Sequence, residues 1–79
     1  MEREKVYKII DNEREYQDKK WINQRSVAEE LLIMKNFLDK AQASYVGVLG
    51  ESVALDQVRK VVAIGIRCME NNSNGVIRR

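Results

Sequence analysis

The sequence predicts an all-α fold: a three-helix subunit that forms an intersubunit helical bundle. Apolar residues recur at three- and four-residue spacing along most of the chain, and no proline interrupts them. The segment 61–66 has no polar side chain, and a helix that is apolar on every side must be covered on every side. A chain of 79 residues has few other elements to cover it, so we expect a homo-oligomer, a dimer or a tetramer.

The first helix is expected over residues 2–20. Glu13 is the unusual member of its repeating face, because a buried carboxylate needs a partner, a metal or a proton. We favour a Glu at the edge of the face that hydrogen-bonds to a Trp or an Arg. Gln17 and Trp21 continue the same line, so a ligand site there stays open. The face comprises Val6, Ile9, Ile10, Glu13, Tyr16 and Gln17.

The second helix is expected over residues 26–46, because Ser26 and Glu29 have the spacing of a capping box. Its apolar stripe comprises Val27, Leu31, Met34, Leu38, Ala41 and Tyr45. After a break at 46–51, Ser52 is the expected cap of a third helix over 52–70, and 71–79 is a polar tail. The whole chain, 1–79, therefore reads as a single domain.

Composition excludes several classes of function. The chain has no histidine, which removes imidazole bases and most zinc sites. A net charge of +2 makes nucleic acid an unexpected partner. No apolar run reaches the roughly 20 residues of a membrane helix, so we expect no membrane partner. Cys68 is the only cysteine and no signal peptide is evident, which favours the cytoplasm.

Any metal would therefore be a hard cation such as Mg²⁺, held by carboxylates. The candidate ligands are Glu30, Asp39 and Asp56, with a solvated acidic face as the alternative for each. Glu30 and Asp39 are nine residues apart and lie on opposed faces of one helix, so one ion cannot easily take both.

A nucleotide is the other candidate ligand. Arg59, next to Lys60, can bind a phosphate, or it can pair with a carboxylate of another helix. Trp21, next to Lys20, can stack a base, or it can cover the core at a helix end. Glu13, Gln17, Trp21 and Arg59 are therefore the candidate ligand-binding residues.

One stretch of the chain resembles the Glu-Arg-x-x-Gln…Trp opening of a phage- and mobile-element-borne branch of the MazG-like proteins, which are all-α nucleotide pyrophosphohydrolases. That stretch is Glu13-Arg14-Glu15-Tyr16-Gln17, followed by Trp21. The segments 26–41 and 58–70 are similar to the two helices that follow in that branch. The resemblance implies a Mg²⁺-dependent enzyme that splits nucleoside triphosphates between the α and β phosphates.

The family's metal motifs are incomplete in this chain. Of the Glu-Glu-x-x-Glu motif, Glu29 and Glu30 are present, but Ile33 takes the place of the third acid. If Asp39 is matched to the third acid instead, Lys35 and Asn36 replace the pair. No Glu-x-x-Asp motif occurs in the third helix, where Arg59 lies near an expected acid.

Three functions therefore stay open. The first is a MazG-like oligomer that has lost the metal site and serves in binding or regulation, with a nucleotide as a candidate ligand. The second is an active Mg²⁺-dependent pyrophosphohydrolase. The third is a helical adaptor for a protein or a nucleic acid. The missing acids favour the first.

Overall fold

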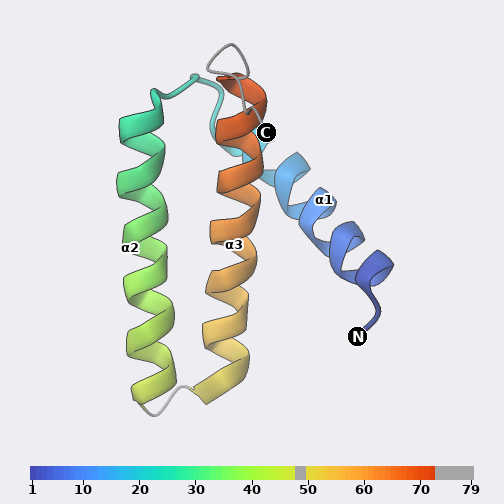
Figure 1. Ribbon diagram of the computed structural model, residues 1–79, viewed down its shortest axis with the longest axis vertical. Coiled ribbons are helices and arrows are strands. Elements are labelled where there is room, and N and C mark those ends of the chain that lie inside the picture. Colours follow the sequence, from blue (N-terminus) through green and yellow to red (C-terminus); the bar gives the residue numbers. More distant parts are fainter. Residues whose placement is uncertain (48–49, 73–79) are drawn as a thin grey trace, which may run out of the picture.

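A computed structural model describes residues 1–47 and 50–72, and in those residues it has three helices and no strand. α1 spans Arg3–Lys20, α2 spans Val27–Val46 and α3 spans Gly50–Asn71. α2 and α3 form an antiparallel hairpin, and α1 leans away from it towards the N-terminus (Figure 1). The predicted all-α class is confirmed, and each helix end lies within two residues of its expected position.

The start of α2 follows the predicted capping box. The Ser26 hydroxyl oxygen accepts a hydrogen bond from the Glu29 amide at 3.2 Å, and the Glu29 carboxylate accepts one from the Ser26 amide at 3.0 Å. These bonds satisfy two amides that would otherwise have no partner at the helix end. The sequence signal and the local structure therefore agree in detail.

The prediction that Ser52 caps the third helix is wrong. α3 begins at Gly50, so Ser52 lies within its first turn. Gly50 has a φ of 85°, a left-handed conformation that glycine adopts without steric cost. The chain can therefore turn into α3 earlier than a capping serine would require.

The subunit has a small core between α3 and its two neighbours. The apolar residues at its centre are Ile10, Ala41, Ala54, Ala63, Ile64 and Cys68. The expected stripe of α2 faces α3 only in part, because Val27, Leu31, Leu38 and Tyr45 remain exposed. α2 instead turns Glu30 and Ser44 inwards beside Ala41. On α1, Ile10, Glu13 and Gln17 are buried, whereas Val6, Ile9 and Tyr16 are not.

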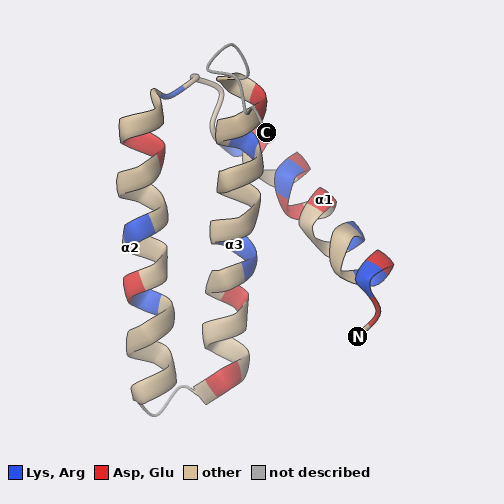
Figure 2. Ribbon diagram, in the orientation of Figure 1, with Lys and Arg blue, Asp and Glu red and all other residues tan. Residues whose placement is uncertain are grey.

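The described helices include none with the length and apolar character needed to cross a membrane. Cationic and anionic residues are interspersed along α1, and much of α2 and α3 is uncharged (Figure 2).

Candidate functional site

Arg67 organises a polar interior where the end of α1 meets α3. Its side chain is 3% exposed and donates to the carbonyl oxygens of Trp21 at 2.8 Å and Asn23 at 3.1 Å. A longer bond of 3.3 Å reaches the carbonyl oxygen of Gln17. These carbonyls belong to the last turn of α1 and the connection to α2. Arg67 therefore links that connection to α3, near the end of the hairpin where α2 begins and α3 ends.

Glu30 balances the charge of Arg67. Its side chain is fully buried, with one carboxylate oxygen 3.8 Å from Nε of Arg67 and 3.9 Å from a terminal nitrogen of Arg25. Within the described residues, neither oxygen accepts a hydrogen bond. The interaction is therefore an ion pair without the directional bonds that usually offset the desolvation of a buried carboxylate.

A second polar cluster lies further along α1 and α3. One terminal nitrogen of Arg59 is 3.5 Å from the Glu13 carboxylate, and the other is 2.6 Å from Asp56. Gln17 donates its side-chain amide to Glu13 at 3.1 Å. Glu13 does lie next to an Arg, but it is buried rather than at the edge of the face, and it accepts its hydrogen bond from Gln17 instead of an Arg or a Trp. The pairing of Arg59 with a carboxylate of another helix is observed.

An open cavity of about 410 Å³ lies beside this cluster, lined by Asn12, Glu13, Tyr16, Arg59 and Lys60. The cations in its lining are Arg59 and Lys60. The Glu13 carboxylate lies within 4 Å of Arg59, and the Asp56 carboxylate lies within 4 Å of both cations, at 3.8 Å from Lys60. Two negative charges therefore offset two positive charges. A phosphate entering the cavity would meet little excess positive charge.

The predicted ligand-binding residues are only partly brought together. Glu13, Gln17 and Arg59 lie in one cluster. Trp21 lies at the end of α1, where the guanidinium of Arg25 is 4.6 Å from its ring centroid. That stacking uses one of the two indole faces on which a nucleobase could stack.

The three predicted magnesium ligands lie in different places. Glu30 is in the interior beside two guanidinium groups, and Asp39 pairs with Lys35 at 3.0 Å on the outside of α2. Asp56 pairs with Arg59 on α3. Among residues 1–47 and 50–72, no three acidic or thiol side chains gather as a group that could hold a metal ion.

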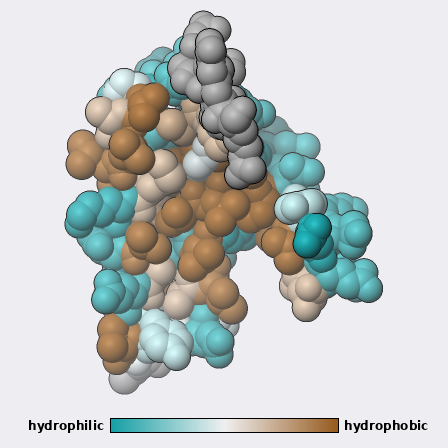
Figure 3. Space-filling model, viewed as in Figure 1, coloured by the Kyte–Doolittle hydropathy of each residue, from teal (hydrophilic) through white to brown (hydrophobic). Residues whose placement is uncertain are grey.

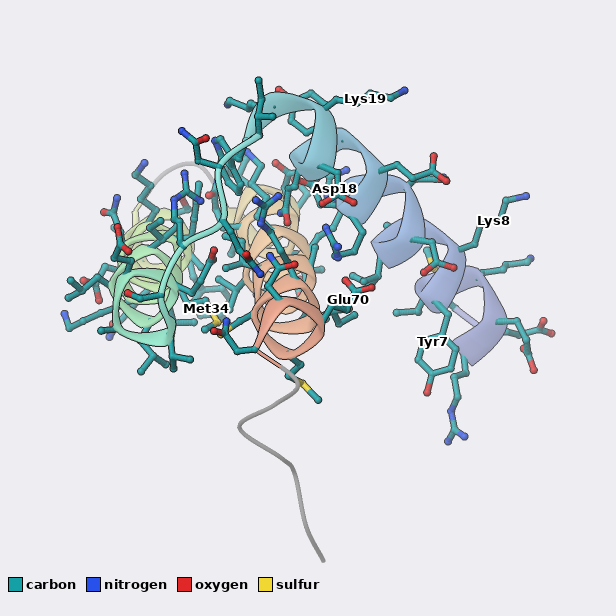
Figure 4. All side chains as sticks on the ribbon, turned by 90° about the horizontal axis from the view of Figure 1, so that it is seen from above. Tyr7, Lys8, Asp18, Lys19, Met34 and Glu70 are labelled. Carbon is teal, nitrogen blue, oxygen red and sulfur yellow. The ribbon has the colours of Figure 1, made fainter. Side chains whose placement is uncertain are left out.

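Arg14 completes the polar contacts between α1 and α3. It bonds to Asp18 at 3.0 Å on its own helix and to Glu70 near the end of α3. Asp18 of α1 and Glu70 of α3 lie between the two helices, whereas Lys8 and Lys19 point outwards (Figure 4). Asp18 also accepts from Arg67 at 3.2 Å, so the two arginines share one carboxylate.

An apolar face lies uncovered on α3 and α1. Figure 3 shows hydrophobic side chains gathered over the hairpin and reaching towards α1. Between α1 and α3 these side chains line a groove of about 430 Å³. We define the apolar face as Leu55, Val58, Val62, Ile66 and Met69 of α3 with Val6, Tyr7 and Ile9 of α1.

The sequence predicted uncovered apolar surface at 61–66, and part of that run does lie on the apolar face. The run 61–66 signalled a helix with too little cover, and the structure buries Ala63 and Ile64 while Val62 and Ile66 remain open. One indication in the sequence points to Arg67 as a link between the helices: it is a charged residue within an otherwise apolar stretch. Neither a family model, nor a curated protein, nor a solved structure matches this chain.

Proposed function

We propose that the chain functions as a self-associating helical module, a MazG-like homo-oligomer that serves in binding or regulation. The observation that carries this proposal is the apolar face. Val62, at its centre, is 44% exposed although it lies in the middle of the longest helix. Apolar surface of this kind, uncovered in one subunit, is typical of a subunit interface.

The size of the apolar face supports this proposal. The exposed fractions of its eight side chains add up to between three and four complete residues. At roughly 170 Å² for a large side chain, the face offers on the order of 600 Å² per chain. The largest apolar patch on a typical monomer is about 300–600 Å², and a standard interface buries about 800 Å² per partner. The face is therefore large for a monomer of this length and close to what a dimer needs.

α2 extends the face on the other side of α3. A cavity of about 490 Å³ runs between Leu38 and Tyr45 of α2 and Val58 of α3. Leu31 and Val27 continue the exposed apolar positions of α2 towards its start. A partner that covers α3 would reach these side chains as well, which raises the buried area.

Oligomer formation is tested by sedimentation equilibrium at micromolar concentration. The wild type should be a dimer or a tetramer. Val62→Asp should dissociate it, because the substitution places a charge in the shared core. Leu32→Asp is the matched control, since Leu32 is 69% exposed on α2 and lies outside the apolar face. It should leave the oligomer intact. A well-folded wild-type monomer at that concentration would refute the proposal.

The enzymatic alternative makes a separate prediction. A Mg²⁺-dependent pyrophosphohydrolase needs carboxylates available to a cation, whereas Glu30, Asp39 and Asp56 each lie within 4 Å of a Lys or an Arg. We expect little or no pyrophosphate release from dATP, dCTP, dGTP or dUTP at millimolar Mg²⁺. Turnover that is abolished by Glu30→Gln would establish the enzyme instead.

Nucleotide binding without turnover is tested by thermal unfolding. A ligand that binds the folded state raises the melting temperature by mass action. The same nucleotides, with and without Mg²⁺, should be compared for the wild type and Arg59→Gln. A rise that depends on Arg59 would place the nucleotide at the cavity beside Glu13 and Lys60.

A further inference from the structure

We propose that α3 pairs in an antiparallel arrangement with α3 of a second copy, about a two-fold axis that passes at Val62. This inference rests on the proposed function, because it specifies how two copies meet. It is carried by the positions of the exposed apolar side chains on α3, by Gly65, and by the groove between α1 and α3.

The exposed apolar residues of α3 form one straight stripe. Successive residues of an α-helix are about 100° apart, so Leu55, Val58, Val62, Ile66 and Met69 fall within a sector of about 80°. The residues that face α2 and α1, such as Ile64 and Arg67, lie outside this sector. α3 therefore has two sides that are covered within the subunit and a third that is not.

The stripe is symmetric about Val62. Val58 and Ile66 lie four residues before and after it, and Leu55 and Met69 lie seven residues before and after it. In an antiparallel pair centred on Val62, Leu55 of one copy faces Met69 of the other, and Val58 faces Ile66. The same surface is then used by both copies, as a two-fold interface requires.

Gly65 is the second observation, because the isolated subunit does not require a glycine there. A Cβ at this position would meet only the Met34 sulfur, at 3.7 Å, which is an ordinary contact. Glycine is also a poor residue in a helix interior. On the helical wheel Gly65 lies beside Val58 and Val62, at the edge of the stripe. A missing side chain at this point lets a second helix approach closely.

The groove between α1 and α3 would place a second helix in contact with α1 as well as with α3. It is lined by α3 residues of the stripe on one side and by Val6, Tyr7 and Ile10 of α1 on the other. Tyr7 projects from the N-terminal part of α1 (Figure 4), which leans away from the hairpin (Figure 1). A helix seated on the stripe would therefore cover apolar side chains of α1 as well as those of α3.

Disulfide cross-linking between copies tests the pairing. Each variant carries a single introduced cysteine in a chain with Cys68→Ala. The variants are oxidised with diamide, either alone or as a mixture of two. Val62→Cys should give a covalent dimer, because the axis brings the two thiols together. Leu55→Cys alone should not, since its two copies would lie about 21 Å apart along the helices. An equal mixture of Leu55→Cys and Met69→Cys should give a mixed dimer.

The outcomes separate this inference from the proposed function. A cross-linked dimer of Leu55→Cys alone would indicate parallel helices and refute the antiparallel pairing. A dimer by sedimentation in which Val62→Cys does not cross-link would refute the axis but leave the oligomer. A monomer by sedimentation would overturn both.

Gly65→Ala provides a test that does not use cysteines. In the wild type it should raise the dissociation constant of the dimer about tenfold or more, because a methyl group enters a close helix contact. In the Val62→Asp monomer the same change should raise the melting temperature, because alanine is the better helix former. An unchanged dissociation constant would refute a close approach at Gly65.

Discussion

Replacing Arg67 by methionine should remove a large part of the stability of the subunit. Methionine keeps much of the side-chain volume but deletes the charge and the donors to the Trp21 and Asn23 carbonyl oxygens. It also leaves Glu30 buried, with Arg25, at 3.9 Å, as its one remaining cation among the described residues. Breaking a buried pair in this way costs about 3–5 kcal/mol. A domain of this length has a stability of roughly 4–12 kcal/mol.

Urea unfolding, followed by circular dichroism at one fixed protein concentration, measures this loss. The fixed concentration matters because subunit association adds to the apparent stability. Lys35→Met is the matched control: it deletes a cation from the exposed pair with Asp39 and should cost about 0–1 kcal/mol.

The double variant Arg67→Met with Glu30→Leu isolates the ion pair. With both charges gone, neither Arg67 nor Glu30 is left in the interior without the other, so the double variant should be more stable than the sum of the single losses predicts. If Arg67→Met costs less than about 1 kcal/mol, Arg67 is not the tie between the helices that its contacts indicate.

Three further results are expected. Ser26→Ala should lower the free energy of unfolding by about 1 kcal/mol in the same urea assay, because the Glu29 amide loses its acceptor. The hydrogen bond from the Ser26 amide lowers the pKa of Glu29, so its contribution should be present above about pH 4.3 and lost as the pH falls through the lowered pKa. Glu29→Gln should remove that pH dependence, as measured by urea midpoints between pH 5 and 3. The melting temperature of the wild type should rise with protein concentration, whereas that of Val62→Asp should not.

The local features of this fold were predictable because their signals are short-range. The capping box at Ser26 and Glu29 depends on residues three apart, and the helix ends depend on glycines and polar stretches nearby. The start of α3 was not predicted, because a left-handed φ at Gly50 is a backbone conformation and not a side-chain motif. The sequence pointed to Ser52 as the N-terminal cap, whereas the helix begins two residues earlier, at Gly50.

The orientation of α2 was not predictable from periodicity alone. Its apolar residues favour a face through Leu31 and Leu38, yet the helix buries Glu30 and Ser44. The reason lies far away in the chain: Arg67 enters the interior to bind the end of α1, and Glu30 is the carboxylate that balances it. A rule that places apolar residues inside cannot anticipate a charge required by a partner on another helix.

The burial of this ion pair and the exposure of the apolar face have related causes. One side of α3 packs against α2 and another packs against α1. The side towards α1 carries Arg59 and Arg67, which bind carboxylates of α1. The apolar side chains of α3 that would fill a core, Val58, Val62 and Ile66, are left on the third side. None of the described helices covers them. The groove between α1 and α3 borders this third side. The contacts that order the subunit therefore leave an apolar surface exposed, and the second copy proposed above would cover it.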